Sequence, residues 1–142
     1  MSTPLFHLAI PVSDIEQTKT FYVEGLGCGL GRESAQAVIL ELQGHQVVAH
    51  LTHEPLVRQP GIYPRHFGLI FPQAADWEAL LARSQAQQLS FYQQPKHRFP
   101  GQLTEHRTFF LEDPFYNLLE FKYYRHAEAI FGGRELAAVG DR

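Results

Sequence analysis

Cysteine is almost absent from this sequence, and its scarcity excludes two kinds of site. Cys28 is the only cysteine in 142 residues, so the chain has no internal disulfide bond and no zinc site built from clustered cysteines. No run of about 18 apolar residues occurs, and the N-terminal residues lack the pattern of a signal peptide. We therefore expect a soluble, cytoplasmic protein.

An excess of charge of one sign is also lacking. The formal net charge is -3, from 12 Lys and Arg residues against 15 Asp and Glu residues. Nucleic acids and anionic membranes are bound by strongly basic surfaces, and this balance provides none. We expect neither of them as a partner.

Apolar, aromatic and histidine residues, by contrast, are plentiful. Hydrophobic residues make up 44% of the chain and aromatic residues 13%, which is typical of a globular protein with a packed core. The length suits one domain, and we expect residues 1–142 to form it. With eight histidines and one cysteine, any transition metal would have to be bound by imidazole and carboxylate groups.

The same order of elements is predicted twice. In the first half, Ser13 and Glu16 form a capping box that predicts the start of a helix, and the glycine-rich segment 25–31 ends it. Three apolar runs bounded by turn residues predict strands at 5–12, 37–42 and 46–52. We interpret this half, about residues 4–54, as a β-α-β-β-β module, in which these three runs leave one strand unassigned.

The pattern restarts after a linker at residues 53–64. The elements predicted there are a strand at 65–71, a helix at 72–88, a short strand at 89–94 and an irregular basic loop at 95–102. A hairpin with strands at 104–111 and 118–124 follows. We interpret about residues 64–124 as a second β-α-β-β-β module, followed by a loose tail at 125–142. The predicted fold is α+β, with both modules forming one half-open, curved sheet around a cleft.

Glu120, on the second strand of the hairpin, carries the functional interpretation. It lies among apolar and aromatic neighbours, where an ionised carboxylate needs a cation, hydrogen bonds or a route to solvent. His7 and His66 lie at matching places on the first strands of the two modules, each two or three residues after a proline. These first strands and the last strand of the second module can direct side chains into the cleft, so we expect His7, His66 and Glu120 to meet there. The alternative is a hydrogen-bonded cluster without metal.

Two histidines and one carboxylate on one side of an ion leave its other positions open, as catalysis requires. This arrangement favours one divalent metal per chain, held by His7, His66 and Glu120. Fe(II) is favoured, and Mn, Ni and Zn are the alternatives.

Several motifs together resemble the vicinal oxygen chelate superfamily, which includes glyoxalase I, bleomycin-resistance proteins, fosfomycin-resistance thiol transferases and extradiol dioxygenases. They are Phe6-His7-Leu8-Ala9-Ile10-Pro11-Val12-Ser13-Asp14, Phe21-Tyr22, Leu26-Gly27, Arg65-His66-Phe67-Gly68, Glu112-Asp113-Pro114 and Leu119-Glu120-Phe121. The resemblance implies a metal-dependent enzyme with a small-molecule substrate.

One position separates the members of this superfamily. Glyoxalase I has a fourth protein ligand on the last strand of its first module, and the matching residue here is Val48, which cannot bind metal. The three-ligand pattern is that of the extradiol dioxygenases and the fosfomycin-resistance enzymes. The resemblance therefore implies an extradiol-like dioxygenase acting on a small catechol-like substrate. The alternatives are a metal-dependent thiol transferase or isomerase, and a non-catalytic small-molecule binding module.

Other polar residues are candidates for roles beside the metal. His50 is a candidate catalytic proton carrier, or else a histidine at the rim of the cleft. Arg98 and Lys122 are candidates for substrate binding, or else a solvated arginine and a lysine paired with an acid on a neighbouring strand. We expect His106 and His126 at the surface.

A half-open sheet exposes strand edges and an apolar flank, so we expect a homodimer. Whether the two modules pair within one chain or across two chains stays open.

Overall fold

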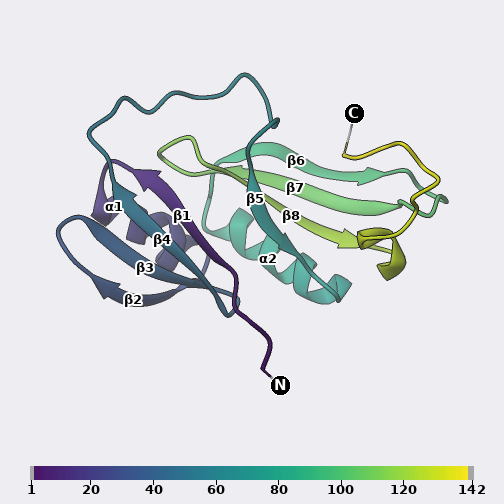
Figure 1. The fold of residues 1–142 in the computed structure, drawn as a ribbon, viewed down its shortest axis with the longest axis horizontal. Coiled ribbons are helices and arrows are strands. Elements are labelled where there is room, and N and C mark those ends of the chain that lie inside the picture. The colour runs from purple at the N-terminus through teal and green to yellow at the C-terminus, as the bar shows by residue number, and fades with distance from the viewer. Residues whose placement is uncertain (1, 141–142) are drawn as a thin grey trace.

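The computed structural model describes residues 2–140, which form two four-stranded sheets with helices on one side of them (Figure 1). The first module contains β1 (His7–Val12), α1 (Ile15–Lys19), the π-helix η1 (Thr20–Gly25), β2 (Gly29–Glu33), β3 (Ala37–Leu42) and β4 (His45–Leu51). The second contains β5 (Phe67–Ile70), α2 (Ala74–Ala86), β6 (Phe91–Arg98), β7 (His106–Glu112) and β8 (Leu118–Tyr124), followed by the 3-10 helix η2 (Ala127–Ile130). The predicted α+β class with two β-α-β-β-β modules is confirmed.

The two sheets have the same topology. Their strand orders are β1-β4-β3-β2 and β5-β8-β7-β6, and in each the first strand pairs in parallel with the last. Ala9 lies opposite Val48, and Gly68 lies opposite Glu120. His7 stands two residues before Ala9, and His66 stands two residues before Gly68, so the two histidines occupy equivalent places in their modules. Val48 and Glu120 likewise occupy equivalent places.

The apolar core lies between the sheets and the helices. Alternate residues of β7 and β8, among them Phe109 and Phe121, are fully buried on the helix side. Trp77 of α2 packs 5.5 Å from the Phe109 ring and donates a hydrogen bond of 2.8 Å to the carbonyl of Phe121. The intervening residues of each strand therefore point to the opposite face, on which Figure 1 shows no helix. We call these two faces the open faces.

The turn between β7 and β8 ties the two modules together. Tyr22 of η1 donates a hydrogen bond of 2.6 Å to the Asp113 carboxylate. Asp113 also accepts from the backbone N–H groups of Phe115 and Asn117, and the Asn117 amide donates to the carbonyl of Pro11 at the end of β1. These hydrogen bonds fix the start of β8 relative to the first module.

Removing the Tyr22 hydroxyl should destabilise the protein. Tyr22 is 1% exposed, so Tyr22→Phe leaves the Asp113 carboxylate short of one donor in a buried site. We expect a loss of about 1–3 kcal/mol in the free energy of unfolding by urea. Tyr116→Phe, at a side chain that is 43% exposed, is the control and should change it by less than about 0.5 kcal/mol. Equal effects of the two substitutions would contradict the prediction.

Three of the differences from the predicted elements concern the cap of the first helix, strand β2 and strand β6. The helix is capped by Asp14, not Ser13, because the Asp14 backbone is extended and its carboxylate accepts the Gln17 N–H at 2.7 Å. Strand β2 begins inside the glycine-rich segment, since Gly29 and Gly31 allow a close approach to β3. The segment 95–98, predicted as loop, belongs to β6 and pairs with β7.

Among the described residues, no helix has the length and apolar character needed to cross a membrane.

Candidate functional site

The open face of the second sheet holds a pair of titratable side chains, of which Glu120 is buried and His66 is partly buried. His66, just before β5, places Nε2 3.1 Å from Oε1 of Glu120 on β8. The other carboxylate oxygen of Glu120 accepts a hydrogen bond of 2.6 Å from the Thr108 hydroxyl on β7. Lys122, two residues along β8, holds its ammonium 3.8 Å from Oε1. The alternation of side chains along adjacent strands brings these four groups to one face.

The tautomer of His66 is fixed by the backbone. Its Nδ1 lies 2.7 Å from the carbonyl oxygen of Ile62, which can only accept, so Nδ1 carries the hydrogen. In the neutral ring Nε2 then has a lone pair, and this lone pair faces a carboxylate oxygen. Two lone pairs at that distance repel unless a cation lies between them. The pair is therefore built around a cation, either a proton on Nε2 or a metal ion.

The donor set fits a divalent metal ion. Imidazole nitrogen and carboxylate oxygen bind such ions at about 2.0–2.2 Å, so two adjacent ligands at right angles lie roughly 3 Å apart. The separation of 3.1 Å between His66 Nε2 and Glu120 Oε1 agrees with this value. The bond from Nδ1 to the Ile62 carbonyl and the bond from Thr108 are the outer contacts that commonly orient such ligands.

Glu120 has polar partners in addition to its apolar neighbours, as the metal-free alternative also requires. Burial pushes the pKa of Glu120 upward, but hydrogen bonds with His66 and Thr108 and the charge of Lys122 outweigh it, so its pKa lies below its usual value. The hydrogen bond with Glu120 raises the pKa of His66, against the effect of burial. Without metal, the two groups therefore favour each other's charged forms.

This pair gives the metal-free protein a defined pH dependence. The raised pKa of His66 adds stability that is complete below about pH 6.5 and is lost as pH rises through the folded-state pKa. The lowered pKa of Glu120 adds stability that is present above about pH 4.3 and is lost as pH falls. With chelator present, wild type should lose more stability than His66→Gln between about pH 6 and 9. A difference between them that is independent of pH would contradict this.

A cavity of about 180 Å³ opens beside the pair. Arg98 and Lys122, the predicted substrate-binding residues, both line it together with His66 and Glu120. Its other lining residues are Ile62, Tyr63, His106, Phe110, Val139 and Gly140. Residues 139 and 140 come from the segment predicted as a loose tail, which returns across the second sheet, while residues 141–142 lie outside the described residues.

His106 and Thr108 are site residues that the sequence analysis missed. His106 was expected at the surface but is only 4% exposed, with its ring packed between those of Phe99 and Tyr124. Thr108 is fully buried. Both lie on β7 opposite Tyr124 and Lys122, and therefore on the face that carries Glu120. The register of the hairpin was the signal that would have found them.

His7 and His50 lie on the other sheet. Both are exposed on the open face of the first module, and His7 Nδ1 lies 2.6 Å from the Gln46 side chain. Within residues 2–140 of one chain, no group of three His, Cys, Asp or Glu side chains is close enough to hold a metal ion. One chain thus joins His66 to Glu120 but does not join His7 to them.

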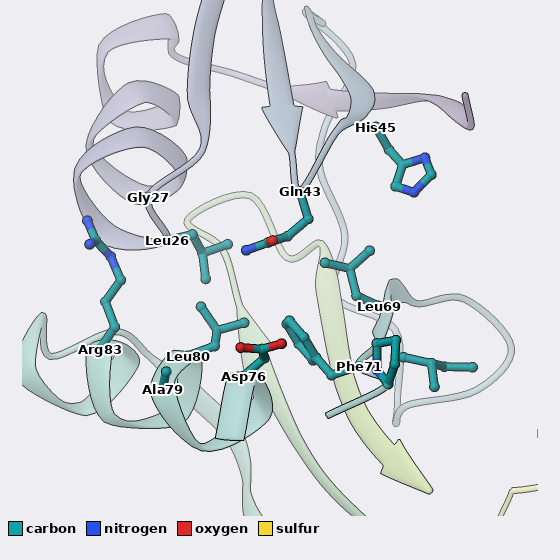
Figure 2. Close-up of a pocket in the computed structure, with 12 residues that line it drawn as sticks. Leu26, Gly27, Gln43, His45, Leu69, Phe71, Asp76, Ala79, Leu80 and Arg83 are labelled. Atoms are coloured by element: carbon teal, nitrogen blue, oxygen red, sulfur yellow. The ribbon is translucent and has the colours of Figure 1, made fainter. Parts of the chain in front are cut away.

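A larger cavity, of about 740 Å³, lies where the two modules meet and lacks this chemistry (Figure 2). Leu26, Leu69 and Leu80 form much of its wall. Arg83 also lines it, and its guanidinium donates to the carbonyls of Gly25 and Glu24 at 2.8 and 2.9 Å. No pair of titratable side chains comparable with His66 and Glu120 lines it.

Fold and site together define a two-module protein with a histidine–carboxylate pair on an open sheet face. Residues 5–121 match the model of the glyoxalase/bleomycin resistance protein/dioxygenase superfamily. The chain belongs to this superfamily, whose members include lyases, transferases and dioxygenases and typically bind a divalent metal. None of the curated proteins with which the chain was compared matches it.

Solved structures support the same assignment. A glyoxalase/bleomycin resistance protein/dioxygenase from Alicyclobacillus acidocaldarius is 40% identical, with a TM-score of 0.85 over 90% of this chain and 96% of that one. The fosfomycin resistance protein FosX from Listeria monocytogenes is 16% identical, with a TM-score of 0.70 over 91% and 99%. Lactoylglutathione lyase from Agrobacterium tumefaciens is also 16% identical, with a TM-score of 0.63 over 87% and 95%. At that identity the last two share the fold alone.

Proposed function

We propose that the chain is a divalent-metal-dependent enzyme whose ion is held by His66 and Glu120 of one copy and by His7 of a second copy. The observation that carries this proposal is the cation-demanding geometry of His66 and Glu120, with Nδ1 of the imidazole committed to the Ile62 carbonyl. The proposed ion is Fe(II), with Mn, Ni and Zn as alternatives.

The case for a second copy comes from the open face of the first sheet. This face exposes His7, His50 and Ala9, and Ile39 beside them is only half-buried. Apolar and imidazole groups in such a position are suited to an interface, and a homodimer in which this face meets the open face of the second sheet would complete both sites. His50, the candidate proton carrier, would then reach the cavity together with His7.

The cavity residues indicate the kind of substrate. Lys122 and Arg98 are permanent donors that would bind an anionic oxygen, and Phe110 supplies an apolar wall. The bound metal would lower the pKa of a substrate hydroxyl and stabilise negative charge on oxygen. Val48, at the place equivalent to Glu120, offers no fourth ligand, so positions remain for two adjacent substrate oxygens.

We therefore propose an extradiol-like dioxygenase acting on a small catechol-like substrate. Consumption of oxygen by the iron-loaded protein, measured electrochemically with a panel of catechols, tests this activity. Oxygen consumption that needs both iron and a catechol supports it. Turnover of a thiol or an isomerisation without oxygen would instead assign a metal-dependent transferase or isomerase. Ligand binding that survives a chelator, without turnover, would assign a binding module.

Mixing two inactive variants tests whether the site is shared. His7→Ala and Glu120→Ala should each bind no metal alone. In a mixed dimer, His7 of one copy meets His66 and Glu120 of the other, so one intact site should form and metal binding should return to half a site per chain in the mixed species. A site within one chain cannot be restored in this way. Metal content after refolding the variants together, measured on the isolated mixed dimer, separates the two arrangements.

A further inference from the structure

A second histidine, His106, lines the cavity beside Glu120. Nδ1 of His106 lies 2.9 Å from the carbonyl oxygen of Thr104, an acceptor only, so Nδ1 carries the hydrogen and Nε2 carries the lone pair. The ring is packed against Phe99 and Tyr124, with centroid distances of 5.9 and 5.1 Å, which limits its rotation. Burial lowers the pKa of His106, which favours the neutral ring.

The other polar side chains lining the cavity are less suited to that task. Arg98 and Lys122 can only donate. His66 and Glu120 face each other at 3.1 Å and are the proposed metal ligands. The Tyr63 hydroxyl is a much weaker base than an imidazole. Of the side chains that one chain places around the cavity, His106 is therefore the one outside the proposed metal ligands that has a basic lone pair.

We propose that His106 is a catalytic residue that takes a proton from a substrate hydroxyl bound in this cavity. The O–H bond of the hydroxyl breaks, its electron pair stays on the oxygen, and a new N–H bond forms at Nε2. The N–H group at Nδ1 continues to donate its hydrogen bond to the Thr104 carbonyl, which stabilises the imidazolium. Lys122 of β8 and Arg98 of β6, which also line the cavity, stabilise the oxyanion that results. Glu120 of β8 and His66, just before β5, are the other titratable groups that line the cavity with His106.

This inference rests on the proposed function, because it needs a hydroxyl substrate beside the His66–Glu120 pair. It narrows the substrate to a small molecule with an acidifiable hydroxyl. The volume of about 180 Å³ is roughly that of six water molecules in the liquid, so a single small ring or a short oxyacid suits it.

The test uses 4-nitrocatechol, which has two adjacent hydroxyls and whose visible absorption shifts as each proton is lost. It is added to the zinc-loaded protein, since zinc is redox-inert. In wild type the fully deprotonated probe should appear at a lower pH than in His106→Asn, by at least about one pH unit. Asparagine keeps an amide near the position of Nδ1, where it can still donate to Thr104, but has no group at Nε2. His126→Asn is the control and should match wild type.

A second measurement needs no variant. Ring-nitrogen NMR of wild type should show His106 as the Nδ1–H tautomer before the probe is added and as imidazolium afterwards. Equal titration of the probe in wild type and His106→Asn, or a ring that stays neutral with the probe bound, would overturn the role of His106 alone. Failure of wild type to bind zinc would overturn the proposed function itself, and this inference with it.

Discussion

Adding one methyl group at Gly68 should prevent the second module from folding as observed. A Cβ built there would overlap the carbonyl oxygen of Glu120 and would lie 2.6 Å from its carbonyl carbon and 2.9 Å from its nitrogen. These are backbone atoms of the neighbouring strand, so no rotamer change relieves the clash, and β5 must separate from β8. Overpacking usually costs about 1–3 kcal/mol, and a clash between backbones should cost about 3 kcal/mol or more.

The effect should extend from stability to the site. Gly68 pairs with Glu120, and His66 stands two residues before Gly68 on the same chain segment, so displacing β5 separates Nε2 of His66 from the carboxylate. Gly68→Ala should therefore lower both the melting temperature and the affinity for metal. Gly61→Ala, where an added Cβ meets nothing within 4 Å, is the matched control and should change neither. Equal melting temperatures for the two variants would refute the argument.

The equivalent position in the first module explains why a sequence repeat does not reveal this requirement. Ala9 stands there, opposite Val48, and its Cβ is accommodated. The glycine is thus required by the close approach of β5 to β8, a feature of one pair of strands and not of the repeated pattern.

The sequence predicted the modules, the repeat and the equivalence of His7 with His66, because strands with alternating burial and turns rich in Gly, Pro and Asn have strong local patterns. It also contained more information than the predictions used. The hairpin turn at residues 113–117 fixes pairs whose numbers sum to 230, such as Phe110 with Glu120 and His106 with Tyr124. Applying that register would have placed His106 and Thr108 on the face of Glu120.

Other features depend on contacts that no local pattern specifies. The hydrogen bond of His66 to the Ile62 carbonyl arises from the conformation of the loop before β5. The return of residues 139 and 140 to the cavity likewise depends on the path of the chain after η2. The separation of His7 from His66 within one chain follows from how the modules pack, with Tyr22 and Pro11 bonded to a turn that lies far away in the sequence.

Replacing Glu120 by glutamine should abolish tight metal binding while leaving the fold intact. The amide oxygen can still accept from Thr108, which is fully buried, so the hydrogen bond at the β7–β8 pair is kept. What is lost is the anionic ligand. Changes in the outer contacts of metal ligands cost about 10–100-fold in affinity, so loss of a ligand should exceed about 100-fold. Isothermal titration of the metal-free protein with Mn(II) or Zn(II) measures this.

Thermal stability should report the same loss. A metal present at about 100 times its dissociation constant adds about 2.7 kcal/mol to the free energy of unfolding, which raises the melting temperature by roughly 10 °C for a chain of this size. Wild type should show this rise, whereas Glu120→Gln, His66→Ala and His7→Ala should not. His126→Gln serves as the control for loss of a histidine outside the site and should behave as wild type.

The three variants should also differ from one another in the absence of metal, which separates the metal site from a merely structural cluster. His66→Ala and Glu120→Gln both break the His66–Glu120 pair, so both should lose the fall in stability that the metal-free protein shows above about pH 6.5. His7→Ala leaves that pair intact, because His7 lies on the other sheet beside Gln46, and should keep it. The combination of lost metal binding with an unchanged pH profile is therefore expected of His7→Ala alone.

If His7→Ala binds metal as tightly as wild type, the ion does not use this histidine. If Glu120→Gln does so too, the metal-dependent enzyme is ruled out and the small-molecule binding module takes its place.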